Sequence, residues 1–125
     1  MKILVTGVMG QLGHDVTEEL KKHNIEYIGC DREEFDLTDK NATENFILEN
    51  KPDGVIHCAA YTAVDKAEDE EELCRKINAE GSLYIAEVCE KLGAKMIYVS
   101  TDYVFGGDGE EPYEPEDEKN PQNVF

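Results

Sequence analysis

Three glycines, Gly7, Gly10 and Gly13, have the spacing G-x-x-G-x-x-G. They lie between an apolar run, residues 2–6, and an amphipathic run that ends at Lys22, which predicts a strand, a tight turn and a helix. The first glycine lets the chain reverse, the second leaves space for a pyrophosphate, and the third lets the helix pack closely on the strand. Amides at the start of the helix would then face the phosphates. A purely structural turn is the alternative, but this context favours a dinucleotide site.

A carboxylate bears on which dinucleotide is bound. Asp31 follows the apolar run 26–30, at the place where an acid accepts hydrogen bonds from the hydroxyls of the adenosine ribose. This favours NADH, whereas Arg32 beside it could meet the 2′-phosphate of NADPH. Both cofactors therefore stay open, and a simple turn acid is the alternative role for Asp31.

Two later segments carry small and hydroxylated residues. Cys58–Thr62 holds two successive alanines against which an extended ligand could lie, with close packing of small side chains as the alternative. Ser100–Tyr103 offers hydroxyls and the acid Asp102, and a hydroxyl there can donate a hydrogen bond to a carbonyl oxygen that gains charge. His57 lies in a strand-like run and is interpreted as a core residue. The sequence shows no Ser–His or Cys–His pair that would indicate a nucleophile.

A parallel sheet would bring these segments to one edge, because ligands bind at the carboxyl ends of its strands. Thr38 and Thr62 are the expected caps of the second and third helices. The alternation of strands and helices predicts an α/β fold, the N-terminal portion of a Rossmann-like doubly wound parallel sheet with strand order 3-2-1-4. Strands are expected at 2–6, 26–30, 54–58 and 95–100, and helices at about 11–22, 39–50 and 62–92.

The composition permits one domain and excludes some partners. The chain has 125 residues, of which 40% are hydrophobic, enough for a single core. Its 12 basic and 29 acidic residues give a net charge of −17, which argues against nucleic acid and anionic membrane surfaces as partners. The densest acidic stretches, 65–72 and 108–118, are interpreted as a solvated helix start and a solvated loop.

The cysteines indicate a reducing compartment. Cys30, Cys58, Cys74 and Cys89 form no C-x-x-C pair and have no histidine at ligand spacing, so they are interpreted as buried thiols and no metal site is expected. A strand-like run follows Met1 directly, and no apolar run approaches membrane length. We therefore expect neither a signal peptide nor a membrane span, and a cytoplasmic location.

Four longer segments carry a resemblance to a known family. They are Thr6–Gly13 (T-G-V-M-G-Q-L-G), Asp36–Asp39 (D-L-T-D), Ala59–Glu68 (A-A-Y-T-A-V-D-K-A-E) and Ser100–Phe105 (S-T-D-Y-V-F). Together they resemble dTDP-4-dehydrorhamnose reductase, a family of extended short-chain dehydrogenases/reductases. The resemblance implies hydride transfer from NADH or NADPH to the C4 ketone of dTDP-6-deoxy-L-lyxo-4-hexulose, which makes dTDP-L-rhamnose.

The resemblance also implies roles for individual residues. Thr101 would take the hydroxyl role at the reacting carbonyl, and Asp102 would touch the dTDP-sugar substrate. Mg²⁺ enters as a cofactor only through this resemblance. The implied cofactor-binding residues are Gly7, Gly10, Gln11, Leu12 and Gly13 around the pyrophosphate, Asp31 at the ribose, Asp36 and Leu37 beside the adenine, and Ala60, Tyr61 and Thr62 along the rest of the cofactor.

One position departs from the family. Phe125 stands where the resemblance places the catalytic tyrosine of a Y-x-x-x-K segment, and it has no hydroxyl to protonate an alkoxide. We therefore expect residues 1–125 to be the NAD(P)-binding domain, truncated before that segment and the sugar-nucleotide domain, and inactive alone. We also expect a homodimer or other self-association through the uncovered sheet edge. The alternatives are a non-catalytic NAD(P)-binding regulatory subunit and a related sugar-nucleotide epimerase or dehydratase.

Overall fold

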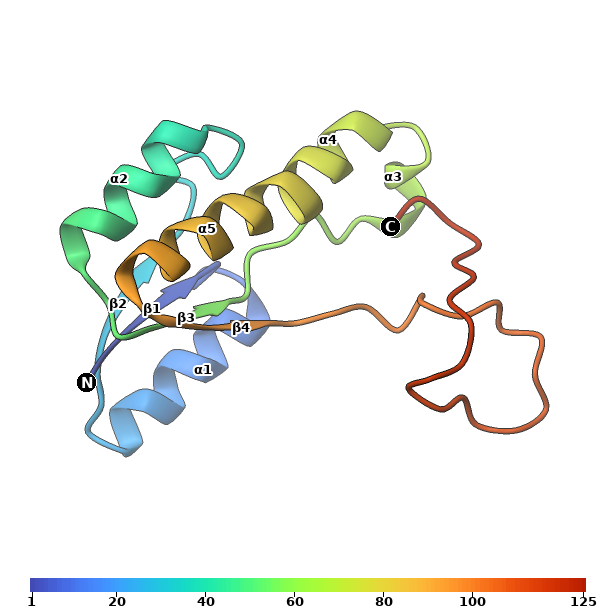
Figure 1. Ribbon diagram of the computed structural model, residues 1–125, viewed down its shortest axis with the longest axis horizontal. Coiled ribbons are helices and arrows are strands. Elements are labelled where there is room, and N and C mark those ends of the chain that lie inside the picture. The colour runs from blue at the N-terminus through green and yellow to red at the C-terminus, as the bar shows by residue number, and fades with distance from the viewer.

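A computed structural model describes all residues, Met1–Phe125. Four parallel strands form one sheet, with α1 on one face and α2 and α5 on the other (Figure 1). The predicted Rossmann-like α/β fold is confirmed. The strands are β1 (Lys2–Thr6), β2 (Glu26–Cys30), β3 (Gly54–His57) and β4 (Lys95–Tyr98), and the helices are α1 (Gln11–Lys22), α2 (Lys40–Asn50), α3 (Val64–Ala67), α4 (Glu71–Arg75), the π-helical turn η1 (Lys76–Gly81) and α5 (Ser82–Leu92).

The predicted strand order 3-2-1-4 is wrong, because the sheet has the order β2-β1-β3-β4. β3 lies next to β1, in a register that pairs Leu4 with Val55, and both side chains are buried. β2 takes the edge instead, where Glu26 is exposed and Tyr27 half-buried. β2 therefore lies on one side of β1 and β3 on the other, although all strands are parallel. Right-handed crossovers in these two opposite senses place α1 and α2 on opposite faces of the sheet. The carboxyl ends of β1 and β3 meet at this switch point, where ligands of such sheets bind.

Two hydrophobic clusters stabilise the structure. The main core lies between the sheet and the helices α2 and α5, and its buried members are Leu4, Cys30, Ile47, Val55, Ile85, Val88 and Cys89. The second cluster consists of Tyr61, Ala67 and Cys74, against which Ile77, Val124 and Phe125 pack. All four cysteines are free thiols, and burial raises the pKa of Cys30 to about 12.

The helix ends differ in detail from the predictions. Asp39, not Thr38, caps α2, because its carboxylate accepts a hydrogen bond from the amide of Ala42. The predicted helix over 62–92 is interrupted between α3 and α4, and Thr62 is not its cap, since α3 begins after Ala63 without a side-chain cap. From α4 onward the helix continues without a break through η1 and α5 to Gly93, whose left-handed conformation (φ 66°) ends it as predicted.

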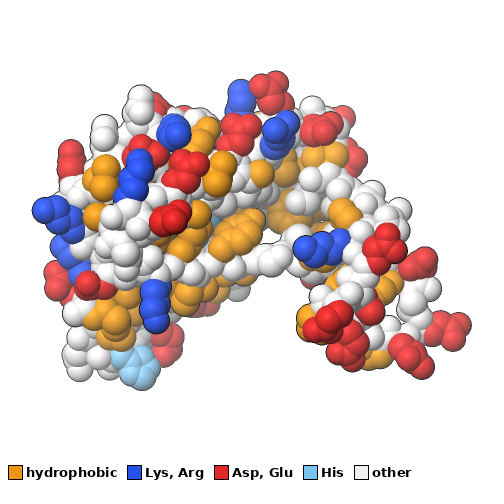
Figure 2. Space-filling model, in the orientation of Figure 1, with side chains coloured by type: hydrophobic (Ala, Val, Ile, Leu, Met, Phe, Trp, Pro, Cys, Tyr) orange, Lys and Arg blue, Asp and Glu red, His pale blue; other side chains and the backbone are white.

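Residues 99–125 form no helix or strand. They leave the end of β4, turn through an outlying loop and return to place the C-terminus beside α3 (Figure 1). The acidic stretch 108–118 lies in this loop, fully exposed, as the red side chains at the lower right of Figure 2 show. The solvated-loop interpretation is confirmed. Not one helix of the protein combines the length and apolar character that crossing a bilayer requires.

Candidate dinucleotide-binding site

The glycine-rich turn is built so tightly that two of its residues admit no side chain. Gly7 has a φ of 70°, and a Cβ there would lie 2.7 Å from the backbone nitrogen of Ala59. A Cβ on Gly13 would lie 2.1 Å from the carbonyl oxygen of Gly7. The first glycine thus lets the turn pass over the end of β3. The third brings α1 close to the backbone of Gly7 and Val8 in the turn, whereas the spacing predicted close packing of the helix on the strand.

The start of α1 has unused hydrogen-bond donors. Gly10 occupies the N-cap position without a side-chain cap, and the first turn of the helix contains no acidic residue. The backbone amides of Gln11 and Leu12 donate to no group of the protein. These amides and the positive end of the helix dipole suit an anion, so the residues present fit the pyrophosphate of a dinucleotide.

Asp31 lies at the carboxyl end of β2, directly beside this turn. Its carboxylate accepts a hydrogen bond of 3.0 Å from the amide of Met9 and one of 2.8 Å from the amide of Arg32. Asp31 therefore does support the turn, as one interpretation of the sequence proposed. Each carboxylate oxygen still has a second lone pair, which leaves acceptor capacity for a ribose hydroxyl.

A series of buried side-chain hydrogen bonds joins Thr6, at the end of β1, to Ser82, at the start of α5. Thr6 Oγ1 accepts hydrogen bonds of 3.1 Å from the amides of Cys58 and Ala59, so its own proton goes to Nδ1 of His57, 2.7 Å away. His57 Nε2 then donates to the hydroxyl of Ser82 at 3.1 Å. This assignment fixes one neutral tautomer, and burial lowers the pKa of His57 to about 4. His57 is a core residue, as predicted, and its two ring nitrogens link Thr6 with Ser82.

The same series of hydrogen bonds continues from Ser82 to the loop after β3. Ser82 donates to the carbonyl oxygen of Asn78 at 2.7 Å. The Asn78 side chain accepts from the amide of Tyr61 at 2.8 Å and donates to the carbonyl oxygen of Tyr61 at 3.0 Å. Tyr61 is buried in the second cluster, and its hydroxyl donates to the carboxylate of Glu70, which raises the pKa of Tyr61 to about 12. Asn78 therefore fixes the backbone of Tyr61 and Glu70 fixes its side chain, which positions the neighbouring residues Ala60 and Thr62.

Asp36 and Leu37, the residues implied beside the adenine, take local roles in this structure. Asp36 accepts two hydrogen bonds from Thr38, through the hydroxyl and the amide, and these lower the pKa of its carboxyl. Leu37 packs against Gly81, where a Cβ would come within 2.5 Å of it. Both residues lie in the loop between β2 and α2, and any contact with an adenine stays a prediction.

The residues implied at the reacting carbonyl lie after β4. Thr101 Oγ1 accepts a hydrogen bond of 3.0 Å from the amide of Tyr103 and donates to Asp102 over 3.5 Å. The ring of Tyr103 meets the ring of Phe125 edge-on, with centroids 6.0 Å apart. Tyr103 thus brings the segment after β4 together with position 125.

The sequence interpretation missed Asn78 and Ser82. An asparagine inside a helix, followed by serine four residues later, was the available signal, because asparagine is unfavourable there without a specific partner. The π-helical turn η1 that contains Asn78 is itself a feature often found at functional sites. For metals, no cluster of three or more His, Cys, Asp or Glu side chains is arranged to hold an ion.

Comparison with known proteins accounts for this arrangement. The family described as the RmlD substrate binding domain matches residues 1–125. The chain belongs to the RmlD family. A dTDP-4-dehydrorhamnose reductase from Mycobacterium tuberculosis is 42% identical to it over 128 residues, which cover 99% of this chain. The resemblance found in the sequence is thereby confirmed.

A solved structure and a relative of another kind extend this comparison. The structure of dTDP-4-dehydrorhamnose reductase from Bacillus anthracis, in complex with NADP, superposes with a TM-score of 0.93 at 39% identity and covers 98% of this chain. Methionine adenosyltransferase 2 subunit beta from Bos taurus is 34% identical over 99% of the chain. The chain spans 41% of the M. tuberculosis protein, 39% of the bovine protein and 44% of the B. anthracis chain. The chain therefore spans less than half the length of each of these relatives.

Proposed function

We propose that this chain is the dinucleotide-binding part of a reductase that acts on a dTDP-linked keto sugar. The unused amides of Gln11 and Leu12 carry the proposal, because they form an anion site that the protein itself leaves without an acceptor. The similarity to dTDP-4-dehydrorhamnose reductases supports dTDP-6-deoxy-L-lyxo-4-hexulose as substrate and dTDP-L-rhamnose as product. A cytoplasmic location belongs to the same proposal.

The residues of the site divide the work. NADH or NADPH, when bound, supplies the hydride. The helix start at Gly10–Leu12 binds the pyrophosphate, and Asp31 accepts hydrogen bonds from the ribose. The hydroxyl proton of Thr101 is engaged only in a long bond to Asp102, so it can turn to donate to a substrate carbonyl, while the oxygen keeps its hydrogen bond from the Tyr103 amide. Asp102 then faces the sugar nucleotide.

Position 125 limits what residues 1–125 do alone. Phe125 has no hydroxyl, so it cannot protonate an alkoxide. We expect this polypeptide to bind the cofactor without turning over the sugar. Phe125→Tyr should not restore turnover by itself, because a tyrosine with a pKa of about 10 is a poor acid at neutral pH without a neighbouring lysine.

A second candidate function is a regulatory subunit that binds the dinucleotide without catalysis. Phe125 favours it, and so does the similarity to methionine adenosyltransferase 2 subunit beta. Both candidates require cofactor binding. Co-sedimentation of this protein with a methionine adenosyltransferase would favour the second candidate over the first.

The test of the shared claim is a calorimetric titration with NADH and with NADPH, at cofactor concentrations up to the millimolar range. Gly10→Val should abolish binding while the protein stays folded, since a Cβ there meets only the carbonyl oxygen of Gly7, at 3.3 Å. Gly109→Val, a change in the outlying loop, should bind like the unaltered protein. No heat with either cofactor would refute the proposal.

A further inference from the structure

One conspicuous part of the sequence, residues 63–68, has no role in the cofactor site. Its last residue contacts a part of the chain 56 positions away: Glu68 Oε1 accepts a hydrogen bond of 2.8 Å from the backbone amide of Val124. Its buried residue, Ala67, is fully enclosed in the second cluster. Both features point toward the returning end of the chain.

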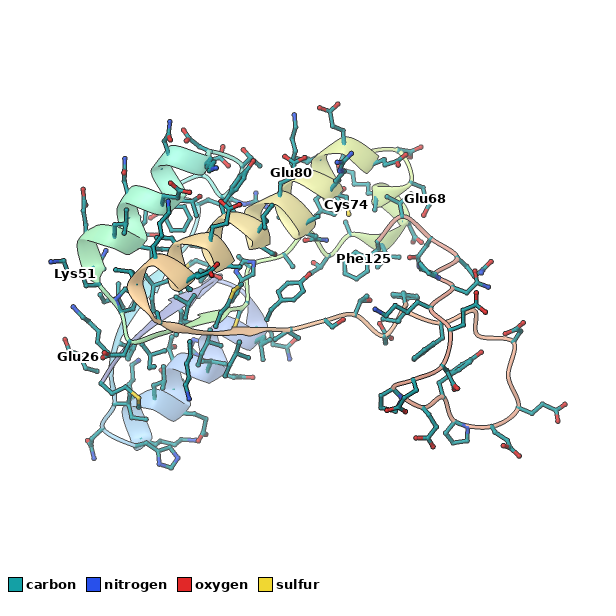
Figure 3. The ribbon with its side chains drawn as sticks, viewed as in Figure 1. Glu26, Lys51, Glu68, Cys74, Glu80 and Phe125 are labelled. Carbon is teal, nitrogen blue, oxygen red and sulfur yellow. The ribbon has the colours of Figure 1, made fainter.

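The contact at Glu68 is special because residues 99–125 are otherwise loosely held. The other hydrogen bonds of this segment, such as that from the Asn120 amide to Val104, join its own residues. The bond from Val124 to Glu68 is the one hydrogen bond between the segment and the rest of the protein. Val124 and Phe125 also pack against the second cluster, and Figure 3 shows Phe125 below α4, on the side of the Cys74 side chain, with Glu68 nearby.

The interruption between α3 and α4 gives this contact its geometry. In a continuous α-helix, residues two positions apart face different directions. Here Glu68 binds the amide of Val124, whereas Glu70 accepts the hydroxyl proton of Tyr61. Val124 and Tyr61 belong to the same cluster, so the break lets both carboxylates serve it.

From these contacts we infer that Glu68 is a positioning residue, which holds the backbone amide of Val124 and so fixes residue 125 against Tyr103 in the segment after β4. The segment 63–68 then acts as a clamp: Ala67 belongs to the cluster on which the returning chain packs, and Glu68 binds the backbone of that chain. The contact itself is independent of any cofactor. Its meaning for the reaction rests on the proposed function, since the family resemblance places a tyrosine at position 125.

The test compares three variants of the isotope-labelled protein by NMR. Glu68→Ala removes the acceptor, Glu68→Gln keeps an oxygen that can accept the same bond, and Asp69→Ala removes a neighbouring exposed carboxylate. Solvent exchange of the Val124 amide is measured, together with nuclear Overhauser contacts between the Val124 methyl groups and the side chains of the second cluster. The Cys74 amide, which is bonded to the carbonyl oxygen of Glu70, reports whether α4 stays folded.

We expect Glu68→Ala to accelerate Val124 exchange about tenfold, the loss typical of a hydrogen bond to a charged group, and to weaken the contacts of Val124 with the second cluster. Glu68→Gln should change exchange less than about threefold, and Asp69→Ala should leave it unchanged. Equal exchange in Glu68→Ala and the unaltered protein would overturn the inference, as would equal acceleration by Asp69→Ala. If Glu68→Ala also exposes Cys74, Glu68→Asp replaces it, because its shorter side chain withdraws the carboxylate from the Val124 amide: accelerated Val124 exchange then supports the inference, and unchanged exchange overturns it. Cofactor titration tests the proposed function separately.

Discussion

The side chain of Asn78 forms two hydrogen bonds with the backbone of Tyr61, of 2.8 and 3.0 Å, across 17 positions of sequence. It thereby satisfies both polar groups of a buried residue in the loop that follows β3. The carbonyl oxygen of Asn78 accepts a hydrogen bond from the hydroxyl of Ser82. That hydroxyl in turn accepts a hydrogen bond from His57. The π-helical turn thus connects the loop after β3 with the strand itself.

The first prediction concerns this connection. Asn78→Ala should lower the free energy of unfolding by about 2 kcal/mol, because it leaves the amide and carbonyl of Tyr61 without partners. Cofactor affinity should fall as well, since residues 59–62 lose their support. Urea unfolding and NADH titration measure the two effects. Asn41→Ala, at an exposed position of α2, is the control and should change neither. Unaltered stability of Asn78→Ala would contradict the role assigned here.

How far the sequence predicted the structure depends on whether the determining contacts are local. The turn at Gly7–Gly13 and the end of α5 at Gly93 were predictable, because backbone conformation and close approach at one place decide them. The order of the strands was not. It depends on whether residues 54–57 pair with β1 or lie beyond β2, and both arrangements use the same alternation of strand and helix. Two features of the sequence agree with the observed order: the charged Glu26 suits an edge strand, and the short apolar run 54–57 suits a strand inside the sheet.

The site shows the same division. The residues of the glycine-rich turn and Asp31 could be named in advance because a motif fixes their spacing. Asn78 and Glu68 could not, because each acts on backbone groups 17 and 56 positions away. Their function appears only when the interrupted helix brings them to the second cluster and the loop after β3.

The glycine-rich turn gives a prediction about stability. Gly13→Ala should destabilise the fold by at least about 3 kcal/mol, because its Cβ would lie 2.1 Å from a backbone oxygen that cannot move independently. Gly10→Ala should cost less than about 1 kcal/mol, because its Cβ approaches the same oxygen only to 3.3 Å. Thermal and urea unfolding of the two variants give the comparison. Similar losses in both would show that α1 adjusts its position.

His57 gives a prediction about pH. Its pKa in the folded protein is about 4, below the ordinary value of 6.5, so the unfolded chain binds the proton more readily. The stabilisation from keeping His57 neutral is therefore complete above pH 6.5 and is lost as the pH falls toward 4. The loss is on the order of 3 kcal/mol. His57→Gln should remove this dependence from urea-unfolding curves, whereas the exposed His23→Gln should keep it. A curve unaffected by His57→Gln would mean that another group causes the acid sensitivity.

Asp31 gives a prediction about cofactor preference. Asp31→Ala should weaken NADH binding about tenfold or more, the effect of losing a hydrogen bond to a charged group, while NADPH binding changes less because its 2′-phosphate is no longer repelled. Asp31→Asn is the matched variant, because its oxygen can still accept the hydrogen bond from the Met9 amide. Calorimetric titration with both cofactors distinguishes the roles. An equal loss for both in Asp31→Ala would mean that Asp31 serves the turn alone.

The last prediction concerns the outer edge of the sheet. β4 pairs with β3 on one side only, so its other side presents backbone amides and carbonyls without partners. Ile97, Tyr98 and Val99 are half-exposed or more in this region, which adds apolar surface to the open edge. Such an edge invites pairing with a second copy, so we expect polypeptide 1–125 to self-associate. Ile97→Lys should shift sedimentation toward the monomer, because a charge on an edge strand opposes pairing. Met9→Lys, which alters an exposed apolar residue outside β4, should leave the sedimentation unchanged. A monomeric unaltered protein would refute the prediction, and equal shifts in both variants would place the contact elsewhere.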